Sequence, residues 1–293
     1  MKPTAWQKQD LRTNNIHPNS TLHKIREQIE PYSESPYLDA LVLLTHITSK
    51  TKSDVLTHPT PELTGEQSEQ LEILLHKIKD GISLPYVLGT WEFYKLNFKI
   101  TPDVLIPRPE SEWLVEKGLS WLDEHPHQRT CLDLGTGSGC LAVALAKNKH
   151  DLKVFATDMS YQALLIAREN AQLHNIQERI DFAAVDLLNG IKTKVDLLVA
   201  NLPYIPTNKL KNLAVYQSEP RLALDGGQDG LSYIKEVLIH APNILNPDGL
   251  ILLELDESTG EQVLELTRMS FPDAAVLLIQ DLSNQDRYIQ IQT

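Results

Sequence analysis

The sequence predicts an α/β protein in which a small helical domain precedes an open, mostly parallel sheet. Two observations in the 293 residues lead to this fold class. Before about residue 85, apolar residues recur at helical spacing alone. After about residue 110, apolar runs typical of buried strands alternate with segments of helical periodicity, as in crossover units on a sheet covered on both faces.

Residues 1–85 are predicted to form the helical domain. Three apolar sets at helical spacing follow a polar start of about 20 residues. The third set begins after Thr64, a residue suited to cap a helix, with Gln67 three residues later. Asp80 and Gly81 end this helix, since glycine readily adopts the backbone conformation that closes a helix.

Residues 86–106 are predicted to form a β-hairpin linker. Aromatic and apolar residues typical of strands dominate 86–101, and turn residues interrupt them. The segment Ile106-Pro107-Arg108-Pro109-Glu110 is predicted to be a rigid connector because its two prolines prevent a continuous helix. The second of these prolines is placed to open the helix that follows.

Residues 107–293 contain the alternating pattern and are predicted to form the sheet domain. An open sheet of this kind binds its ligand beyond the carboxyl ends of its strands, so residues that follow a strand are candidates for a site. The predicted strands are 130–134, 153–157, 180–185, 195–200, 249–254 and 275–280, and the predicted helices are 110–122, 139–148, 160–173, 229–241 and 258–269.

Charge and cysteine content narrow the classes of function. The net charge is −12 and lies mostly after residue 85, which disfavours non-specific binding to nucleic acid phosphates. Cys131 and Cys140 are too few for a disulfide framework and lack metal-ligand spacing, so we expect a reducing compartment and no metal. No apolar run approaches a membrane span, and the first residues lack the apolar core of an export signal. These features predict a cytoplasmic protein.

A glycine-rich turn between a predicted strand and a predicted helix is the first candidate for ligand binding. A dinucleotide site prefers G-x-G-x-x-G, whereas the spacing here is G-x-G-x-G. The carboxylate of Asp133 would repel a pyrophosphate but attract an ammonium group, directly or through water. This favours an amino-acid-bearing nucleoside such as S-adenosylmethionine, with a plain strand-to-helix turn as the alternative. The turn consists of Asp133, Leu134, Gly135, Thr136, Gly137, Ser138 and Gly139.

Two acids follow the next predicted strands. Asp158 lies about 20 residues beyond Gly139, where a carboxylate can accept both ribose hydroxyls. Its alternative role is to cap the helix that starts near Ser160. Asp186 and Leu187 follow the third strand and are placed to meet the edge and face of an adenine, although Asp186 can equally be a loop acid.

The turn Asn201-Leu202-Pro203-Tyr204 ends a fourth apolar strand. An asparagine amide oxygen and the next carbonyl can accept the two hydrogens of a planar NH2 group, while Tyr204 offers a face for packing. Attack on a methyl sulfonium depends above all on such alignment. Asn201, Pro203 and Tyr204 are therefore the predicted catalytic residues, and the whole turn is the predicted substrate site. The alternative for Tyr204 is core filling.

Together these motifs resemble the HemK/PrmC family, the peptide chain release factor glutamine N5-methyltransferases. The resemblance extends over most of the chain and includes the helical domain. Its joint set of motifs is far more specific than the glycine turn alone. The further matching segments are 37–40, 85–89, 92–94, 104–112 and 219–227.

The resemblance implies an S-adenosylmethionine-dependent methyltransferase with a Rossmann-like sheet. Its substrate would be the glutamine in the Gly-Gly-Gln loop of bacterial release factors, methylated on the side-chain amide. Residues 135–139 and Asp158 would hold the cofactor, and residues 201–204 would hold the glutamine, with Asn201 also close to the methyl donor. The helical domain would help to recognise the release factor, and no nucleic acid or membrane partner is expected.

The chain departs from the family at Leu202, where proline is usual. Leucine keeps the backbone carbonyl but does not fix φ, which predicts a more mobile turn with similar chemistry. Three other interpretations stay open. The first is glutamine methylation of a ribosomal protein, and the helical domain would decide between this substrate and a release factor. The second is adenine-N6 methylation of DNA or RNA, which fits the same turn but not the acidic charge. The third is a non-catalytic adaptor, which would not need these motifs intact.

Overall fold

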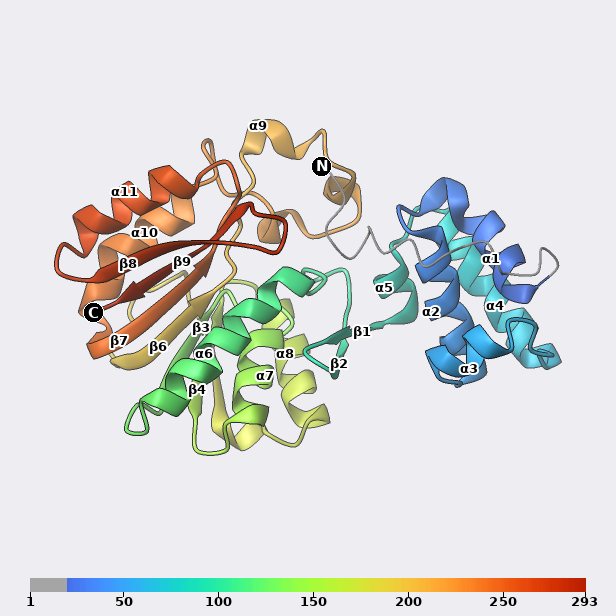
Figure 1. Ribbon diagram of the computed structural model, residues 1–293, viewed down its shortest axis with the longest axis horizontal. Coiled ribbons are helices and arrows are strands. Elements are labelled where there is room, and N and C mark those ends of the chain that lie inside the picture. The colour runs from blue at the N-terminus through green and yellow to red at the C-terminus, as the bar shows by residue number, and fades with distance from the viewer. Residues whose placement is uncertain (1–19) are drawn as a thin grey trace. The chain divides into compact units, whose positions relative to one another are not determined.

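The computed structural model describes residues 20–293 and divides the chain into two compact units, Met1–Gly89 and Thr90–Thr293 (Figure 1). The first residues of the predicted helical domain, 1–19, lie outside the described residues. The helices are α1 (Thr21–Ile29), α2 (Pro36–Thr48), α3 (Lys52–Thr57), α4 (Gly65–Lys79), α5 (Leu84–Leu88), α6 (Glu112–Glu124), α7 (Cys140–Asn148), α8 (Tyr161–Leu173), α9 (Thr207–Leu210), α10 (Ser232–His240) and α11 (Gly260–Ser270). The strands are β1 (Thr90–Phe93), β2 (Leu96–Lys99), β3 (Thr130–Leu134), β4 (Lys153–Asp158), β5 (Ile180–Ala184), β6 (Val195–Ala200), β7 (Leu245–Glu254), β8 (Ala275–Gln280) and β9 (Asp286–Gln292).

Side-chain caps mark the starts of α3 and α4 in the first unit. The predicted start of α4 is confirmed, because Thr64 and Gln67 exchange hydrogen bonds with each other's backbone NH groups at 3.2 and 3.0 Å. Helix α3 was not predicted, yet it starts with a second box of this kind, formed by Thr51 and Asp54. Its single buried side chain leaves too weak an apolar period to reveal so short a helix. Among residues 20–293, no helix combines the length and the apolarity needed to cross a membrane.

The sequence prediction of β-structure from residue 86 onward was wrong at its start. Residues 84–88 form helix α5, with Pro85 in its first turn and Gly89 closing it in the left-handed conformation (φ 70°). Proline at the start and glycine at the end suit a short helix and here override the strand propensity of the residues between them. The hairpin itself is β1 paired antiparallel with β2, and it belongs to the unit Thr90–Thr293.

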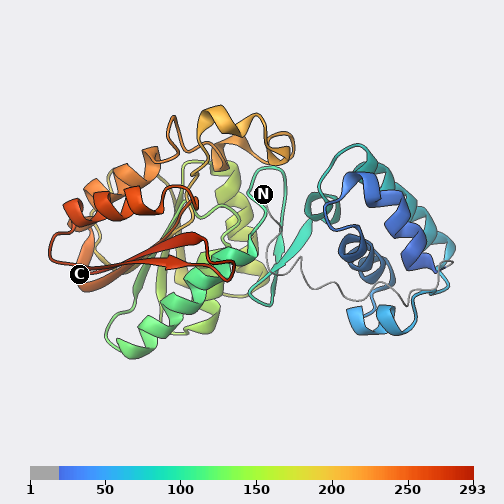
Figure 2. The ribbon, with the colours of Figure 1, turned by 45° about the horizontal axis from the view of Figure 1, so that its top comes forward.

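The second unit contains a seven-stranded sheet in the order β5-β4-β3-β6-β7-β9-β8. Strands β3 to β7 run parallel, while β9 lies antiparallel between β7 and β8 (Figures 1 and 2). Strand β9 was missed because its sequence alternates polar and apolar residues and contains no long apolar run. Strand β7 also starts earlier than predicted, at Leu245 instead of residue 249.

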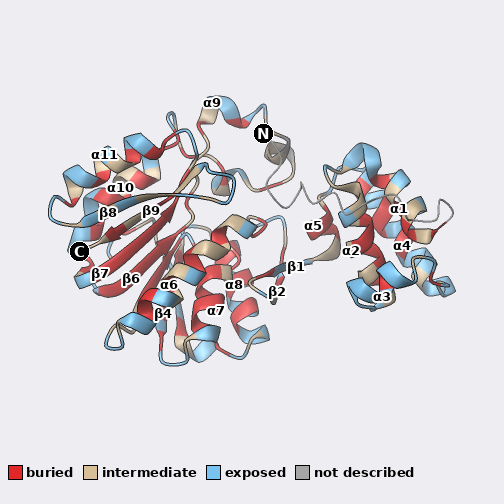
Figure 3. Ribbon diagram, viewed as in Figure 1, coloured by how far each residue is buried: buried red, intermediate tan, exposed pale blue. Residues whose placement is uncertain are grey.

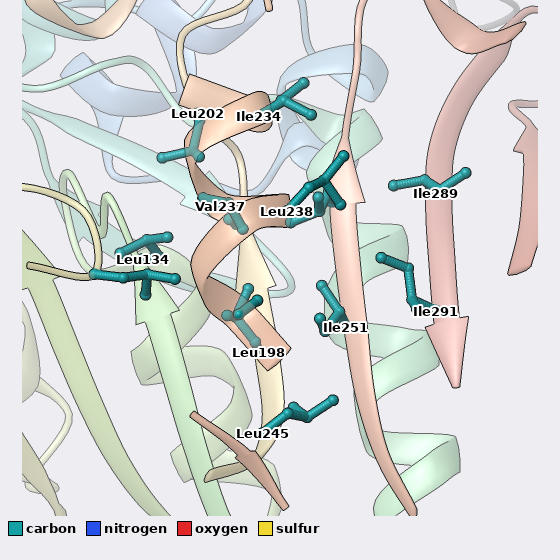
Figure 4. Close-up of a cluster of buried hydrophobic side chains, with 14 of the residues drawn as sticks. Leu134, Leu198, Leu202, Ile234, Val237, Leu238, Leu245, Ile251, Ile289 and Ile291 are labelled. Carbon is teal, nitrogen blue, oxygen red and sulfur yellow. The ribbon is translucent and has the colours of Figure 1, made fainter. Parts of the chain in front are cut away.

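Helices cover both faces of this sheet. Helices α6, α7 and α8 pack on one face, and α10 and α11 lie on the other (Figure 1). The central strands are buried, and all six residues of β6 are among the buried ones (Figure 3). Side chains from β3, β6, β7 and β9 meet those of α10 in a buried apolar cluster (Figure 4). Burial on both faces explains the continuous apolar runs from which these strands were predicted.

The register of the central strands brings their carboxyl ends to one level. Leu134 at the end of β3 pairs with Thr157 of β4 and with Ala200 of β6, and Ala200 pairs with Leu253 of β7. The residues one step beyond this level therefore emerge side by side. They are Gly135, Asp158, Asn201 and Glu254.

Candidate active site

A cavity of about 290 Å³ lies at the carboxyl ends of β3, β4, β5 and β6. The strand order reverses at this point, since β4 and β5 lie on one side of β3 and β6 and β7 on the other. Open α/β sheets bind ligands at such a reversal. Ten of the predicted site residues line the cavity: Gly135, Thr136, Gly137, Ser138, Asp158, Asp186, Leu187, Asn201, Leu202 and Pro203.

The glycine turn forms one wall of the cavity. Gly135 and Gly137 have φ angles of 71° and 55°, in the left-handed region that glycine adopts without strain. The NH group of Gly137 donates to Oδ2 of Asp158 over 2.9 Å, which ties the turn to the end of β4. Gly139 does not line the cavity. A Cβ at this position would stand 3.0 Å from Cβ of Ala167, so Gly139 lets the start of α7 pack closely against α8.

Asp133 lies behind the glycine turn and does not line the cavity. Its Oδ2 accepts hydrogen bonds from Oγ1 of Thr136 at 2.6 Å and from the NH of Ala142 at 3.0 Å, while its buried Oδ1 has no partner. Burial raises the pKa of Asp133 to about 7, against the lowering effect of these two hydrogen bonds. In the structure Asp133 supports the turn through these two hydrogen bonds, and its expected attraction for a ligand ammonium group, directly or through water, stays a prediction.

Asp158 faces the cavity, and both of its oxygens accept backbone hydrogen bonds. Oδ2 accepts from Gly137, and Oδ1 accepts from the NH of Ser160 at 2.8 Å. Burial raises the pKa of this carboxyl, and the backbone hydrogen bonds oppose the rise. The cap of α8 is Ser160, whose Oγ accepts from the NH of Ala163, so the capping alternative for Asp158 is wrong. Each carboxylate oxygen can accept a further hydrogen bond, such as one from a ribose hydroxyl.

Asp186 and Leu187 line the cavity just beyond β5. Leu187 has a φ of 49°, an uncommon conformation for a residue with a side chain. Asp186 accepts a long hydrogen bond of 3.4 Å from Nδ2 of Asn189. Both residues thus line the same cavity as Asp158, and their contact with an adenine stays a prediction.

The side chain of Asn201 is held from behind by two residues that sequence reasoning did not single out. Its Nδ2 donates to Oγ of Ser111 over 2.8 Å, and Ser111 donates to Oε2 of Glu254 over 2.6 Å. The hydroxyl of Tyr204 donates to Oε1 of the same carboxylate over 3.2 Å. Tyr204 is not among the residues that line the cavity, and its hydroxyl lies against Glu254; the packing role of its ring stays a prediction.

Two signals in the sequence pointed to these residues. Ser111 directly follows the proline-bounded connector. Glu254 is the charged residue that ends the apolar run 250–253. Burial raises the pKa of Glu254, while hydrogen bonds from Ser111 and Tyr204 and the positive charge of Arg287 limit this rise. Neither residue is chemically unusual by itself, and only the register of β6 and β7 places Glu254 beside Asn201.

Leu202 is anchored in the core. It is 4% exposed and belongs to the buried cluster of Figure 4 together with Leu134 and Ile234. A Cβ on Gly135 would stand 2.9 Å from Cδ2 of Leu202, so the two turns are in close contact. The leucine therefore adds a packing constraint that the expectation of a more mobile turn did not include.

The segment around residues 219–230 supports the Asn201 turn from the other side. A Cβ on Gly226 would stand 2.7 Å from Cα of Tyr204, so only glycine allows this approach of two backbones. Ile205 and Gly226 are joined by a backbone hydrogen bond of 2.8 Å. Buried Glu219 forms an ion pair with Arg108 and accepts from the NH of Ile106, which fixes the connector beside the cavity.

Comparisons with known proteins agree with this geometry. A family model of the PrmC N-terminal domain matches residues 20–89, and a model of the methyltransferase small domain matches residues 115–228. The hMettl16 catalytic domain, solved in complex with an RNA hairpin, is 14% identical, with a TM-score of 0.55 over 78% of this chain and 82% of its own. At this identity the likeness concerns the fold alone.

Curated relatives carry the assignment further. A release factor glutamine methyltransferase of Moorella thermoacetica is 39% identical over 256 residues, which cover 87% of this chain and 90% of the relative. Another, of Thermodesulfovibrio yellowstonii, is 34% identical over 276 residues, covering 92% and 97%. With this similarity over nearly its whole length, the chain belongs to the release factor glutamine methyltransferase family.

Proposed function

We propose that the protein transfers a methyl group from S-adenosylmethionine to the side-chain amide nitrogen of the glutamine in the Gly-Gly-Gln loop of peptide chain release factors. One observation carries this proposal. The glycine turn, Asp158 and the Asn201 turn line a single cavity, so a bound nucleoside and a bound amide would meet there. The family membership supports the choice of substrate.

The residues of the cavity fit the cofactor. A volume of about 290 Å³ is close to the lower end of small-molecule sites, roughly 300 Å³. The glycine turn offers a close approach to backbone, Asp158 offers carboxylate lone pairs to ribose hydroxyls, and Leu187 offers an apolar surface to a base. When bound, S-adenosylmethionine supplies a methyl group on a positively charged sulfur.

The Asn201 turn fits the substrate amide. We assign Oδ1 of Asn201 and the backbone carbonyl of Leu202 as acceptors for the two hydrogens of the glutamine NH2 group. Holding the amide in this way aligns its nitrogen and draws electron density toward it. Alignment of reacting atoms contributes several kcal/mol to catalysis, roughly 7 kcal/mol or more in favourable cases.

The same proposal names the partner and the compartment. The helical unit would recognise the release factor, a protein surface whose binding is compatible with the net charge of −12. Cys131 and Cys140 are both free thiols, which supports the expectation of a reducing, cytoplasmic location.

The test compares three substrates in parallel. The protein and labelled S-adenosylmethionine are incubated with a release factor, a ribosomal protein and DNA, and we expect label on the release factor alone. A release factor with Ala in place of the Gly-Gly-Gln glutamine is the control, and label on that variant would refute the assignment. Label on the ribosomal protein or on DNA would favour the corresponding alternative.

Replacing Asn201 tests the site itself. We expect Asn201→Ala to lower kcat by about 10²- to 10³-fold, the effect of removing one preorganised hydrogen-bonding group from an active site. The exposed Asn208, substituted in the same way, is the matched control. Full activity of Asn201→Ala would contradict the proposed role of the turn.

A further inference from the structure

A buried chain of hydrogen bonds runs from the cavity wall into the core behind it. Asn201 donates from Nδ2 to Ser111, Ser111 donates to Glu254, and Tyr204 donates to the other oxygen of Glu254. Ser111 is 3% exposed and Glu254 2%, so water does not compete for these bonds. Ser111 immediately precedes α6, whereas Glu254 ends β7, so the chain of hydrogen bonds joins two segments that are far apart in sequence.

Glu254 determines the direction of every hydrogen bond in this chain. An ionised carboxylate accepts and cannot donate; burial raises the pKa of Glu254, but the hydrogen bonds from Ser111 and Tyr204 and the charge of Arg287 oppose this rise and favour the ionised form. The single hydroxyl hydrogen of Ser111 is therefore used on Glu254. The Ser111 oxygen can then only accept a hydrogen bond from Asn201, so Asn201 must donate with its NH2 group. The oxygen of the Asn201 amide is left for the cavity.

We propose that Glu254 and Ser111 act as a positioning pair that holds the Asn201 amide with Oδ1 toward the substrate. This inference rests on the proposed function, because it explains how the acceptor for the substrate amide is oriented. An asparagine side chain turned by half a rotation has nearly the same shape but would present NH2 to the NH2 group of the substrate, donor against donor. The pair removes that alternative without touching the substrate nitrogen.

The first measurement needs no substrate. In protein labelled with ¹⁵N at asparagine, the side-chain signal of Asn201 is identified by its loss in Asn201→Asp. We expect its NH2 group to exchange with solvent slowly in the wild type and at least about tenfold faster in Ser111→Ala and Glu254→Gln, because a lost partner exposes the group to opening. Unchanged exchange in both variants would overturn the proposal.

The second measurement is kinetic. Ser111→Ala and Glu254→Gln should each lower kcat for release factor methylation by about 10- to 100-fold, with the Kd of S-adenosylmethionine changed less than about twofold. Ser111→Thr keeps the hydroxyl and should restore most of kcat. Ser258→Ala is the matched control, since Ser258 donates to Asp256 just beyond the same strand and has no link to Asn201.

A double variant separates positioning from a merely structural role. If Glu254 acts through Asn201, adding Glu254→Gln to Asn201→Ala should cause no further loss of kcat, whereas independent effects would multiply. Multiplying effects would overturn the proposal. If the wild type methylates no release factor, the proposed function fails, and the exchange measurement still decides the orientation of Asn201.

Discussion

Buried acids stand at both ends of the seven-stranded sheet, and their surroundings differ. Near the amino ends, Asp196 accepts hydrogen bonds on both oxygens, from the NH groups of Arg129 and Thr130, the hydroxyl of Thr130 and Nδ2 of Asn246. Near the carboxyl ends, Asp133 accepts on Oδ2 alone, and its Oδ1 has no partner. Burial opposes ionisation in both, but the pKa of Asp196 is lowered and that of Asp133 is raised.

The comparison separates a structural end of the sheet from a functional one. At the amino ends, the polar groups satisfy one another, so Asp196 joins β3, β6 and β7 into one unit. At the carboxyl ends, Asp158 and Asn201 retain capacity that a ligand can use, and this capacity costs stability in the empty protein. Substitutions at the two ends should therefore differ in what they change, stability or binding.

The largest effect is expected for Asp196→Ala. Its removal orphans several donors, so the free energy of unfolding should fall by about 3 kcal/mol, measured by urea denaturation. The affinity for S-adenosylmethionine should stay within about twofold, because Asp196 is at the far end of the strands from the cavity. Asp196→Asn keeps one acceptor and should lose less. A stability unchanged by Asp196→Ala would remove the contrast between the two ends.

Asp158→Ala should show the opposite pattern. Loss of a charged acceptor for the ribose should weaken binding of S-adenosylmethionine by about 10- to 100-fold, as measured by calorimetry, which corresponds to roughly 1.4–2.8 kcal/mol. Its effect on unfolding should be smaller than that of Asp196→Ala, since Asp158 accepts only from backbone groups beside it or in the glycine turn and does not join three strands. Cofactor affinity equal to that of the wild type would exclude Asp158 from the cofactor site.

The third prediction concerns Asp133→Asn, whose effect appears as a pH dependence of stability and not as a fixed loss. The pKa of Asp133 is about 7 in the folded protein, raised by burial and further by the charge of Asp158. Between about pH 4 and pH 7 the folded state holds a proton that the unfolded state has released, so stability falls as pH rises, by about 1.4 kcal/mol per pH unit. This contribution is present at low pH and lost toward neutral pH.

The variant Asp133→Asn cannot titrate at this position. The difference in unfolding free energy between the wild type and the variant should therefore change with pH over that range, while other groups cancel in the subtraction. A difference that is constant with pH would show that the buried carboxyl already has an ordinary pKa. It would also remove the difference in pKa between Asp133 and Asp196 on which the comparison rests.

Much of the sheet could be predicted because strands that are buried on both faces consist of continuous apolar runs, which can be recognised in the sequence. Strands β3, β4 and β6 begin and end within one residue of their predicted bounds, and Thr64 caps α4 as expected. Helix α5 and strand β9 could not be predicted, since one depends on turn residues around a strand-like run and the other on pairing between two neighbours.

The candidate site shows the same division. The glycine turn, Asp158 and the Asn201 turn were found from residue type and position after a strand, because those positions meet at one edge of any parallel sheet. That Gly139 packs against Ala167, and that the Tyr204 hydroxyl bonds to Glu254, followed from contacts between segments far apart in the chain. No local pattern carries such information.

By itself, the sequence determined which residue types stand at the strand ends and hence the class of chemistry they support, because strand periodicity and turn composition are local properties. Only the tertiary structure decided which of those residues face the cavity and which brace it. Strand register brings Gly135, Asp158, Asn201 and Glu254 to one level, and register is set by pairing across the sheet. The orientation of the Asn201 amide depends in turn on Ser111 and Glu254, partners brought to it by folding alone.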